Sequence, residues 1–288
     1  MTFPTVTVIC LCYNQERFVR QCILSVLEQT YPNIQLIVID DASLDNSVEV
    51  ISDLVAEYPH VRFIPLPENS GNCGAFNHAL SFSHGDYIID LAADDILLPD
   101  RIKKGVAAFT LAGDSFGVNF TDADWIKEDG SVVFRHSKRF PHDTIPQGDV
   151  YRQLIERFFI CSPTMMFRRE VIDRLGGYDG SLAYEDFDFW IRSSRDFLYC
   201  YTPEVLVQKR IVQNSLSAKQ FRFQSPQLKS TFHVCEKILV LNKSAAEKQA
   251  LARRIRYELR VCFRLLNFSL AIKYAGLYMR NRARKYTA

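Results

Sequence analysis

The chain has 288 residues, is 48% hydrophobic and carries a formal net charge of +2 at pH 7. This length and apolar content can bury a sizeable core, which excludes a disordered protein and allows one large α/β domain with a helical appendage. The mild charge does not indicate nucleic-acid binding, although local basic clusters can still matter.

In the N-terminal part of the chain, short β-branched apolar runs alternate with stretches in which apolar residues recur at helical spacing. The runs are typical of strands covered on both faces of a parallel sheet, and the spaced stretches predict helices. The expected strands are residues 6–12, 36–39, 61–64 and 87–91, and the expected helices are residues 18–27, 47–58 and 74–82. This alternation predicts a doubly wound, mostly parallel sheet flanked by helices.

The middle of the chain changes character. Residues 117–120 are expected to form a strand, and residues 125–134 a hairpin that turns at Glu128–Ser131. Helices at 151–159 and 169–175 are expected around a strand at 164–167. Beyond about Ser217 the pattern is helical. We therefore expect an α/β domain over residues 1–217 and a helical, basic extension over residues 218–288.

The eight cysteines lie mostly inside apolar runs, without CxxC pairs or metal-finger spacing. This predicts buried, reduced thiols rather than disulfides or zinc ligands. The N-terminal apolar run lacks the basic flank and cleavage site of a signal peptide. No uncharged apolar stretch approaches the roughly 20 residues that span a bilayer. We expect a cytoplasmic protein that could lie peripherally on the inner face of the membrane.

Polar residues follow three of the expected strands, at Tyr13, Asp40-Asp41 and Asp94-Asp95. Because ligands bind outside the carboxyl ends of strands in such sheets, we expect these side chains to converge. A second acidic motif, Tyr184–Trp190, opens an aromatic, helix-like stretch. Buried carboxylates are costly unless a metal, a cation or a proton offsets their charge. The two clusters together predict a divalent-metal site beside a general base.

Six motifs, in order, resemble those of family 2 glycosyltransferases with the GT-A fold, from about Thr5 to Ser217. They are Val8–Asn14, Ile39–Asp45, Glu68–Asn72, Leu91–Asp100, Gly176–Asp179 and Glu185–Asp188. The resemblance implies a GT-A sheet flanked by helices and transfer of a sugar from a nucleotide-sugar to a glycan or lipid-linked acceptor, with inversion. It favours a UDP-sugar over dTDP- or GDP-linked donors, and a bacterial surface polysaccharide or lipopolysaccharide as the product.

The resemblance implies that Tyr13 and Asp41 hold the nucleotide base, with Asn69 and Asp94 also in the nucleotide site. A carboxylate at a strand end can accept a hydrogen bond from an N–H of uracil or a similar base. In the alternative interpretation, residues 40–43 only cap the helix that begins near Ser47, because Asp and Ser favour such turns.

Asp94 and Asp95 match the metal-binding aspartates of the family, which implies Mn²⁺ or Mg²⁺ as a cofactor. A cation held by one or two carboxylates would offset the charge of the diphosphate leaving group. The first aspartate of the usual Asp-x-Asp pattern is Ala92 here, which predicts weaker metal affinity. A loop cap before Pro99 is the alternative role.

Asp186 matches the catalytic base of the family and would take the proton of the acceptor hydroxyl. Glu185 and Asp188 could instead be the base or position the acceptor, and Trp190 could provide packing or a sugar-stacking face. The structural alternative is that Glu185 and Asp186 are acids favoured in the first turn of a helix.

Two further positions depart from the family pattern. Phe76 stands where an arginine is usual. Within residues 208–215, relatives often carry a histidine or arginine that contacts the metal or diphosphate, and this sequence has no histidine there. Arg210 is then a candidate to stabilise the leaving group, and the alternative is that it is a surface charge. With Ala92, these departures motivate an alternative function, a catalytically weak nucleotide-sugar-binding scaffold of the same fold. Gly176 and Gly177 are expected to cap a helix, and the resemblance adds a role in shaping the acceptor side.

Other nucleotide-dependent enzymes are not expected. A nucleotidyltransferase or a Rossmann dehydrogenase would need a glycine-rich loop after the first strand, and none is present there.

Residues 253–285 hold ten Lys and Arg against the single acid Glu258. Apolar residues fall on one helical stripe there, namely Ile255, Leu259, Cys262, Leu266 and Leu270. Such a helix can lie on an anionic bilayer, which would suit a lipid-linked acceptor. Alternatively, the stripe packs on the catalytic domain and leaves the basic face solvated. Nucleic-acid binding is not expected, because a reading motif and an aromatic platform are both missing.

Overall fold

The computed structural model describes residues 3–140, 145–212, 222 and 224–285. The chain divides into two compact units. The first comprises Met1–Gly148, Ile160–Gly180 and Phe197–Val212, and the second comprises Asp149–Phe159, Ser181–Asp196 and Gln213–Ala288. The predicted domain boundary between residues 217 and 218 lies outside the described residues.

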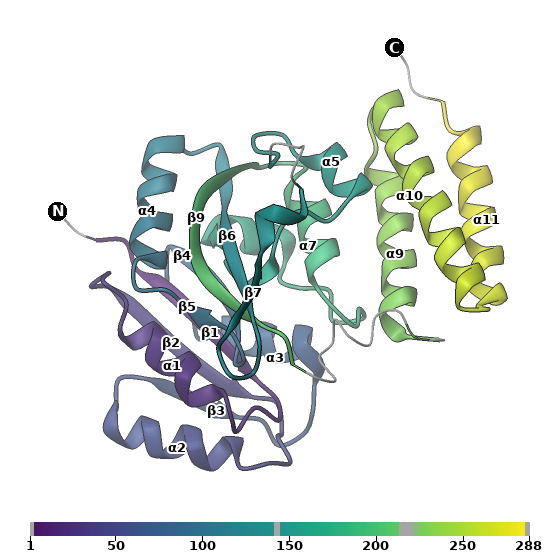
Figure 1. The fold of residues 1–288 in the computed structure, drawn as a ribbon. Coiled ribbons are helices and arrows are strands. Elements are labelled where there is room, and N and C mark those ends of the chain that lie inside the picture. The colour runs from purple at the N-terminus through teal and green to yellow at the C-terminus, as the bar shows by residue number, and fades with distance from the viewer. Residues whose placement is uncertain (1–2, 141–144, 213–221, 223, 286–288) are drawn as a thin grey trace. The chain divides into compact units, whose positions relative to one another are not determined.

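The first unit is built on a mixed sheet (Figure 1). Within the described part of the chain the strand order is β3-β2-β1-β4-β8-β6-β9-β5, with β7 paired to β6. Strands β3, β2, β1 and β4 run parallel, and β8 pairs antiparallel with both β4 and β6. The strands are β1 (Val6–Cys12), β2 (Ile34–Asp40), β3 (Arg62–Pro65), β4 (Tyr87–Ala92), β5 (Ile96–Leu97), β6 (Phe116–Ile126), β7 (Val132–Arg135), β8 (Met166–Arg168) and β9 (Leu198–Arg210).

Helices follow the parallel strands in the alternation that the sequence predicts. All residues of β1 are buried, as expected of a strand covered on both faces. The eight cysteines are buried free thiols, which agrees with the prediction from their apolar surroundings. The helical segments of this unit are α1 (Val19–Leu27), α2 (Ser47–Glu57), α3 (Gly71–Leu80), α4 (Arg101–Ala112), α6 (Arg169–Leu175) and the 3₁₀ turns η1 (His136–Arg139) and η2 (Ser162–Thr164).

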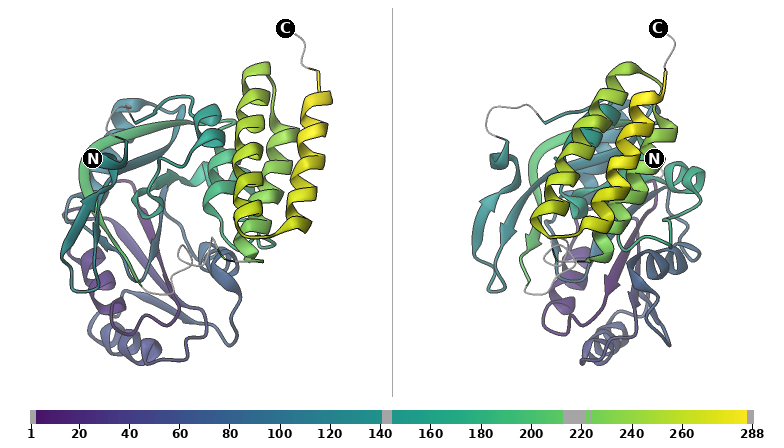
Figure 2. Two further views of the ribbon diagram at one scale, coloured as in Figure 1. Left: turned by 45° about the vertical axis from the view of Figure 1, so that its right-hand side comes forward. Right: turned by 90° about the vertical axis from the view of Figure 1, so that its right-hand side faces the viewer.

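The second unit is helical in its described residues. Its helices are α5 (Tyr151–Glu156), α7 (Asp186–Ser193), α9 (Pro226–Leu241), α10 (Ala245–Arg264) and α11 (Phe268–Ala283). Helices α9, α10 and α11 lie side by side (Figure 2). A capping box fixes the start of α10, because Ser244 accepts from the Glu247 N–H while Glu247 accepts from the Ser244 N–H.

The basic C-terminal region buries most of the predicted apolar stripe inside this unit. Ile255, Cys262 and Leu270 are buried, whereas Leu266 is 65% exposed. Leu266 departs from the stripe because α10 ends at Arg264, and Leu266 turns the chain with a φ of 54°. The prediction of one continuous helical stripe is therefore wrong at this position.

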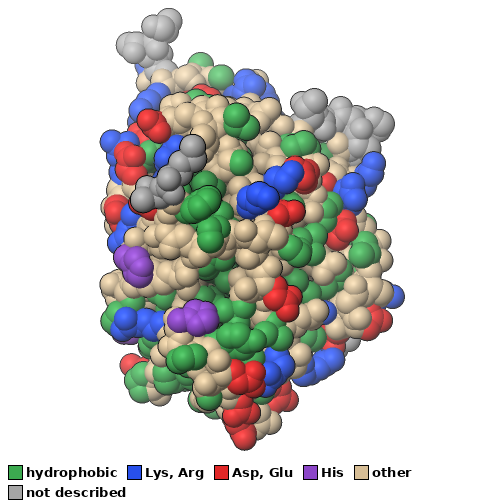
Figure 3. All heavy atoms as spheres, turned by 90° about the vertical axis from the view of Figure 1, so that its left-hand side faces the viewer, with side chains coloured by type: hydrophobic (Ala, Val, Ile, Leu, Met, Phe, Trp, Pro, Cys, Tyr) green, Lys and Arg blue, Asp and Glu red, His purple; other side chains and the backbone are tan. Residues whose placement is uncertain are grey.

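Two surface properties bear on partners. Among the described helices, none combines the length and the apolar content needed to cross a bilayer. On the face drawn in Figure 3, acidic and basic side chains are interspersed.

Candidate functional site

The carboxyl ends of β2, β1 and β4 lie side by side, because β1 pairs with both neighbours. The pairing continues past the strands. The Asp41 N–H donates to the Cys12 carbonyl at 2.8 Å, and the Ala93 N–H donates to the Leu11 carbonyl at 2.9 Å. The loops that carry Tyr13, Asp41 and Asp94-Asp95 thus leave the sheet next to one another, as the strand order predicts.

A set of side-chain bonds clamps the loop after β1 to the loop after β2. The Asn14 N–H donates to Ser43 Oγ at 2.8 Å, and Asn14 Oδ1 accepts from the Leu44 N–H at 2.7 Å. Glu16 Oε2 accepts from both the backbone and the side chain of Asn46. Tyr13, held at this clamp, is 44% exposed and therefore accessible to a ligand.

Asp40 and Asp41 have different structural roles. Asp40 is fully buried and accepts from the N–H and the hydroxyl of Ser43, so it organises its own turn. Asp41 Oδ1 accepts from the N–H and the hydroxyl of Ser70, and its Oδ2 accepts from the Gly71 N–H. Neither carboxylate makes its bonds with the first turn of α2, so the predicted alternative of a cap for that helix does not describe this pair.

Asn69 completes the connection between these loops. Its Nδ2 donates to the Asp41 carbonyl at 3.0 Å, and its Oδ1 accepts from the Gly71 N–H at 3.2 Å. Asp41 and Asn69 therefore set the start of α3 from two sides. The sequence motif indicated both residues, but it gave no sign that Ser70 would contact the Asp41 carboxylate.

Asp94 and Asp95 lie in the tight turn between β4 and β5. Asp95 is 2% exposed, and its Oδ1 accepts from the Arg210 N–H at 2.8 Å. Burial raises the pKa of Asp95 to about 7, where the neighbouring Asp94 also raises it and Lys209 opposes the shift. Burial likewise raises the pKa of Asp94. The turn thus holds two adjacent carboxyl groups that need a cation or a proton to offset their charge.

The chemistry of this pair fits a hard divalent cation. The described residues contain no cluster of three or more His, Cys, Asp or Glu that could enclose a metal. Mg²⁺ and similar ions do not require such a cage, because one or two carboxylates suffice when substrate phosphates and waters complete the shell. Asp94 and Asp95 supply this kind of partial, oxygen-only ligand set.

Hydrogen bonds from Arg210 connect the end of β9 to this turn. Its Nε donates to the Asp94 carbonyl at 3.0 Å, and its Nη2 donates to Gln21 Oε1 at 2.8 Å. Its Nη1 donates to the carbonyls of Lys127 and Glu128. Arg210 is only 4% exposed, so the predicted alternative of a surface charge is wrong. The guanidinium has a positioning role that the sequence did not reveal, since its partners are distant in the chain.

The second unit carries the other acidic motif on α7. Asp188 is 1% exposed, with Arg192 Nε and Lys237 Nζ each 2.6 Å from one of its carboxylate oxygens. Trp190 is 3% exposed and packs edge-on against Phe158, with ring centroids 5.5 Å apart. These contacts favour packing over a sugar-stacking face for Trp190, and they join α7 to α9 through Asp188.

Glu185 and Asp186 begin α7 and are both half-buried. Glu185 is the N-cap residue, and its carbonyl accepts from the Phe189 N–H. A helix N-terminus favours a negative charge, so this position suits an ionised carboxylate. Glu185 and Asp186 are thus more exposed than Asp188, which is fully buried.

The glycine pair after α6 fixes a neighbouring loop in the first unit. Gly176 is the left-handed C-cap of α6, as predicted, with a φ of 69°. Asn77 accepts from the Tyr178 N–H and donates to the Tyr178 carbonyl, both at 2.8 Å. Phe76, at the position of the expected arginine, is fully buried and stacks on Tyr178 at 4.1 Å. An arginine there would have to bury its charge.

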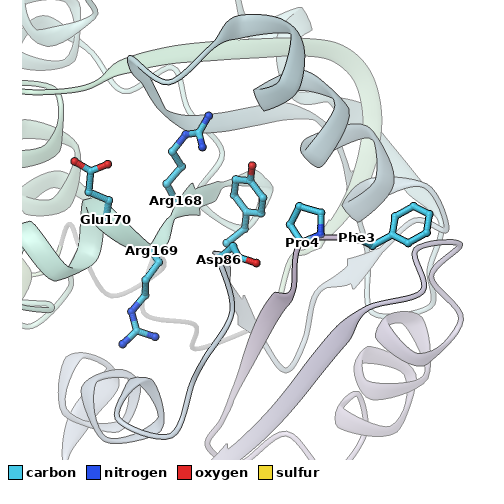
Figure 4. A pocket seen from close by; sticks show the side chains of 7 residues that line it. Phe3, Pro4, Asp86, Arg168, Arg169 and Glu170 are labelled. Atoms are coloured by element: carbon cyan, nitrogen blue, oxygen red, sulfur yellow. The ribbon is translucent and has the colours of Figure 1, made fainter. Parts of the chain in front are cut away.

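A pocket at the amino-terminal end of β4 is not a candidate donor site. It is lined by Phe3, Pro4, Asp86, Tyr87, Arg168, Arg169 and Glu170 (Figure 4). Arg168 and Arg169 point away from each other and bond to other groups, Arg168 to the Phe116 carbonyl and Arg169 to Ser83 and Asp173. The polar groups of this pocket do not converge on a ligand position.

The sequence is similar to known proteins of one family. The family model described as "Glycosyl transferase family 2" matches residues 7–176. An uncharacterized glycosyltransferase of Haemophilus influenzae is 29% identical over 77% of this chain and 85% of its own length. A putative teichuronic acid biosynthesis glycosyltransferase of Bacillus subtilis, TuaG, is 26% identical over 76% of this chain and 84% of its own length.

Solved structures share the fold at low identity. Staphylococcus aureus TarS (residues 1–349, in complex with UDP-GlcNAc) superposes with a TM-score of 0.71 and 17% identity, covering 96% of this chain and 79% of that one. The mannosyltransferase PcManGT of Pyrobaculum calidifontis, in complex with GDP-Man and Mn²⁺, gives a TM-score of 0.63 and 18% identity, covering 98% and 85%. These likenesses confirm the predicted GT-A architecture.

Proposed function

Because the chain belongs to glycosyl transferase family 2, we propose that it transfers a sugar from a nucleotide-sugar, preferably a UDP-sugar, to a hydroxyl of a glycan or lipid-linked acceptor. One observation carries the proposal. The loops that hold Asp41 and Asp94-Asp95 emerge side by side from the carboxyl ends of adjacent strands. A base-binding carboxylate and a diphosphate-neutralising pair belong next to each other, since the base and the diphosphate are parts of one donor.

Tyr13 and Asp41 would hold the base, with Asn69 beside them. A carboxylate accepts about four hydrogen bonds, and three donors contact Asp41, which leaves capacity for an N–H of the base. Exposed Tyr13 offers a ring face. The same fold in TarS and PcManGT binds UDP-GlcNAc and GDP-Man respectively, which supports a nucleotide-sugar in general.

Asp94 and Asp95 would hold Mn²⁺ or Mg²⁺ beside the diphosphate. When bound, the cation offsets the charge that develops on the leaving nucleoside diphosphate. Arg210 contributes by fixing the turn through the Asp95 carboxylate and the Asp94 carbonyl. Its guanidinium therefore acts as a positioning group rather than as a direct contact to phosphate.

Asp186 would be the general base of an inverting displacement. The acceptor oxygen attacks the anomeric carbon while the bond to the diphosphate breaks, and Asp186 takes the acceptor proton. Glu185, at the same helix end, would help to position the acceptor. Asp188 would not share this chemistry, because its two oxygens already pair with Arg192 and Lys237.

We place the enzyme in the cytoplasm, in peripheral contact with the inner face of the membrane through its C-terminal helices. The acceptor class that suits this location is a growing bacterial surface polysaccharide on a lipid carrier. The similarity to TuaG, named for teichuronic acid biosynthesis, supports that class.

Calorimetric titration with UDP, dTDP and GDP, each with Mn²⁺ or with a chelator, tests the donor site. We expect one nucleotide, UDP, to bind with Mn²⁺ and to bind at least about tenfold more weakly without it. Asp95→Asn should weaken UDP binding in the presence of Mn²⁺ and leave binding in the presence of the chelator unchanged. Asp114→Asn is the matched control, since the Asp114 side chain is fully exposed.

The outcomes separate the two candidate functions. Mn²⁺-dependent binding that Asp95→Asn reduces and Asp114→Asn does not would support the enzyme. Binding of a nucleotide-sugar without sugar transfer would support the weak scaffold that Ala92 and Phe76 suggest. Failure of folded protein to bind any of the nucleotides would contradict both.

A further inference from the structure

Helix α11 has two apolar faces, of which only one is buried. Leu270, Tyr274 and Leu277 point into the second unit and are at most 4% exposed. Phe268, Ile272 and Met279 are 55%, 73% and 61% exposed. At about 100° per residue these three lie within roughly 40° of one another, on the side of the helix opposite the buried face. Burial inside the unit does not explain this second stripe.

The exposed apolar surface continues over the turn from α11 to α10. Leu266, in the turn, is 65% exposed, and Phe263, at the end of α10, is 56% exposed. The Phe263 ring lies edge-on to Phe268, with centroids 6.3 Å apart. We call this surface the outer stripe, which comprises Phe263, Leu266, Phe268, Ile272 and Met279.

The exposed charged side chains on α10, α11 and the turn between them are mainly positive, and an acid that reaches α11 from another helix, Glu236 of α9, is paired with Arg280. Residues 243–285 contain only two acids, Glu247 and Glu258. Glu247 pairs with Arg195, and the side chain of Glu258 is 5% exposed beside Arg254, so neither presents a charge at this surface. Exposed cations border the stripe instead, and within the described chain they form no ion pair with an acid. They are Arg260, Arg264 and Lys273.

We propose that the outer stripe is the surface by which this protein binds an anionic lipid bilayer. Apolar side chains on one face of a helix, flanked by Lys and Arg, match the boundary between acyl chains and anionic headgroups. This deepens the proposed function, with its lipid-linked acceptor, by naming the face that meets the membrane. The face differs from the stripe expected from the sequence, since Ile255, Cys262 and Leu270 are buried.

Charge selects the bilayer over other occupants. A second copy of this chain would bring like charges together around the apolar contact, which opposes self-association. Nucleic acid would match the cations but would leave the aliphatic side chains of Ile272, Leu266 and Met279 without an apolar environment. An anionic bilayer satisfies both features at once.

Co-sedimentation of the full chain with vesicles tests the proposal. Vesicles of equal parts phosphatidylcholine and phosphatidylglycerol should bind the protein, and vesicles of phosphatidylcholine alone should bind it several-fold less. The double variant Phe268→Ser with Ile272→Ser should lower partitioning at least about tenfold. Leu111→Ser is the control, because Leu111 is 88% exposed on α4, in the first unit.

A second pair of variants, Arg260→Gln with Arg264→Gln, reduces the positive charge without changing the apolar stripe. Binding to the anionic vesicles should weaken and should lose much of its dependence on salt. Both exposed positions are outside the core, so unfolding curves should match the wild type. Nucleotide titrations should also be unchanged, which separates this proposal from the donor site.

Three results would overturn the proposal. They are no binding of the wild type to anionic vesicles, binding that the serine variant leaves unchanged, and a wild-type dimer in solution that the serine variant dissociates. The last would assign the stripe to a second copy of the chain.

Discussion

The backbone N–H of Arg210 donates a hydrogen bond to Oδ1 of Asp95, with 2.8 Å between the two atoms. The bond joins the last residue of β9 to the turn after β4, 115 positions earlier in the chain. Because the Arg210 side chain also bonds to the Asp94 carbonyl, one residue fixes both proposed metal ligands. The geometry of the proposed metal site therefore depends on the end of the longest strand described.

Arg210→Ala should destabilise the protein and weaken Mn²⁺-dependent nucleotide binding. Loss of the buried guanidinium leaves the carbonyls of Asp94, Lys127 and Glu128 without this donor and empties its site, at a cost of about 2–4 kcal/mol in the free energy of unfolding. Urea denaturation measures the change. Arg17→Ala is the control, because the Arg17 side chain is 63% exposed. Equal stability of the Arg210 and Arg17 variants would refute the positioning role.

Asp95 should contribute stability to the metal-free protein that is lost between about pH 4 and pH 7. Burial raises the pKa of this group in the folded state to about 7, above its unfolded value, so the folded state binds more protons over this interval. Stability is therefore lost as the pH rises through it. Asp95→Asn should remove this part of the pH dependence in urea titrations with a chelator present. An unchanged pH profile in the variant would show that Asp95 is ionised throughout.

Asp41→Asn should weaken nucleotide binding by roughly tenfold. The Asp41 carboxylate accepts from Ser70 through Oδ1 and from Gly71 through Oδ2, whereas an amide has only one oxygen that accepts and would lose part of its capacity for the base. Ser70→Ala removes one donor to the same carboxylate and leaves the charge intact, so it should bind nucleotide nearly as well as the wild type. Calorimetry distinguishes the two. If Ser70→Ala were as damaging as Asp41→Asn, Asp41 would act by holding the loop rather than by contacting the base.

Two neighbouring aspartates of α7 should have different roles, Asp188 in the stability of the fold and Asp186 in sugar transfer. Asp188→Asn removes the charge that two cations share and should lower the free energy of unfolding by about 2–3 kcal/mol. This is less than for a fully buried ion pair, because Arg192 and Lys237 are partly exposed to water. Asp186→Asn should lower sugar transfer at least about a hundredfold. Paired measurements of unfolding and of transfer test this. Transfer that survives in the Asp186 variant would remove that residue from the mechanism.

Gly177→Ala should be more costly than Gly176→Ala. Both glycines have positive φ, so each substitution carries backbone strain of about 1 kcal/mol. An added Cβ at Gly177 would also lie 2.7 Å from Asn77 Oδ1, whereas nothing lies within 4 Å at Gly176. Thermal denaturation of the two variants measures the difference. Equal losses would show that Asn77 moves aside without cost.

The first half of the fold is predictable from the sequence because its patterns are local. Continuous apolar runs gave β1 and β2, and helical spacing gave α1 and α2 to within about two residues. Strand β9 was not predicted, since Pro203 and Glu204 interrupt its apolar pattern and its pairing with β6 is long-range. The start of α3 was placed too late, because the turn at Gly71 follows from bonds to Asp41.

The candidate site likewise contains residues that the sequence predicts and residues whose role depends on contacts between distant segments. The resemblance to known motifs indicated Asp41, Asn69 and Asp94-Asp95, which the sheet brings to adjacent strand ends. The sequence did not reveal that Arg210 would be buried, because the hydrogen-bond partners of its side chain lie on three distant segments. It also did not distinguish Asp188 from Asp186, since the Lys237 that neutralises Asp188 comes from another helix.

The most direct test of the central claim is the release of nucleoside diphosphate from UDP-, dTDP- and GDP-sugars by the full chain, with a bacterial lipid extract as the source of acceptor. We predict release of UDP with Mn²⁺, little release with a chelator, and a fall of at least about a hundredfold in Asp186→Asn. No release above background from any donor by the folded wild type would contradict the account and would favour a nucleotide-sugar-binding scaffold.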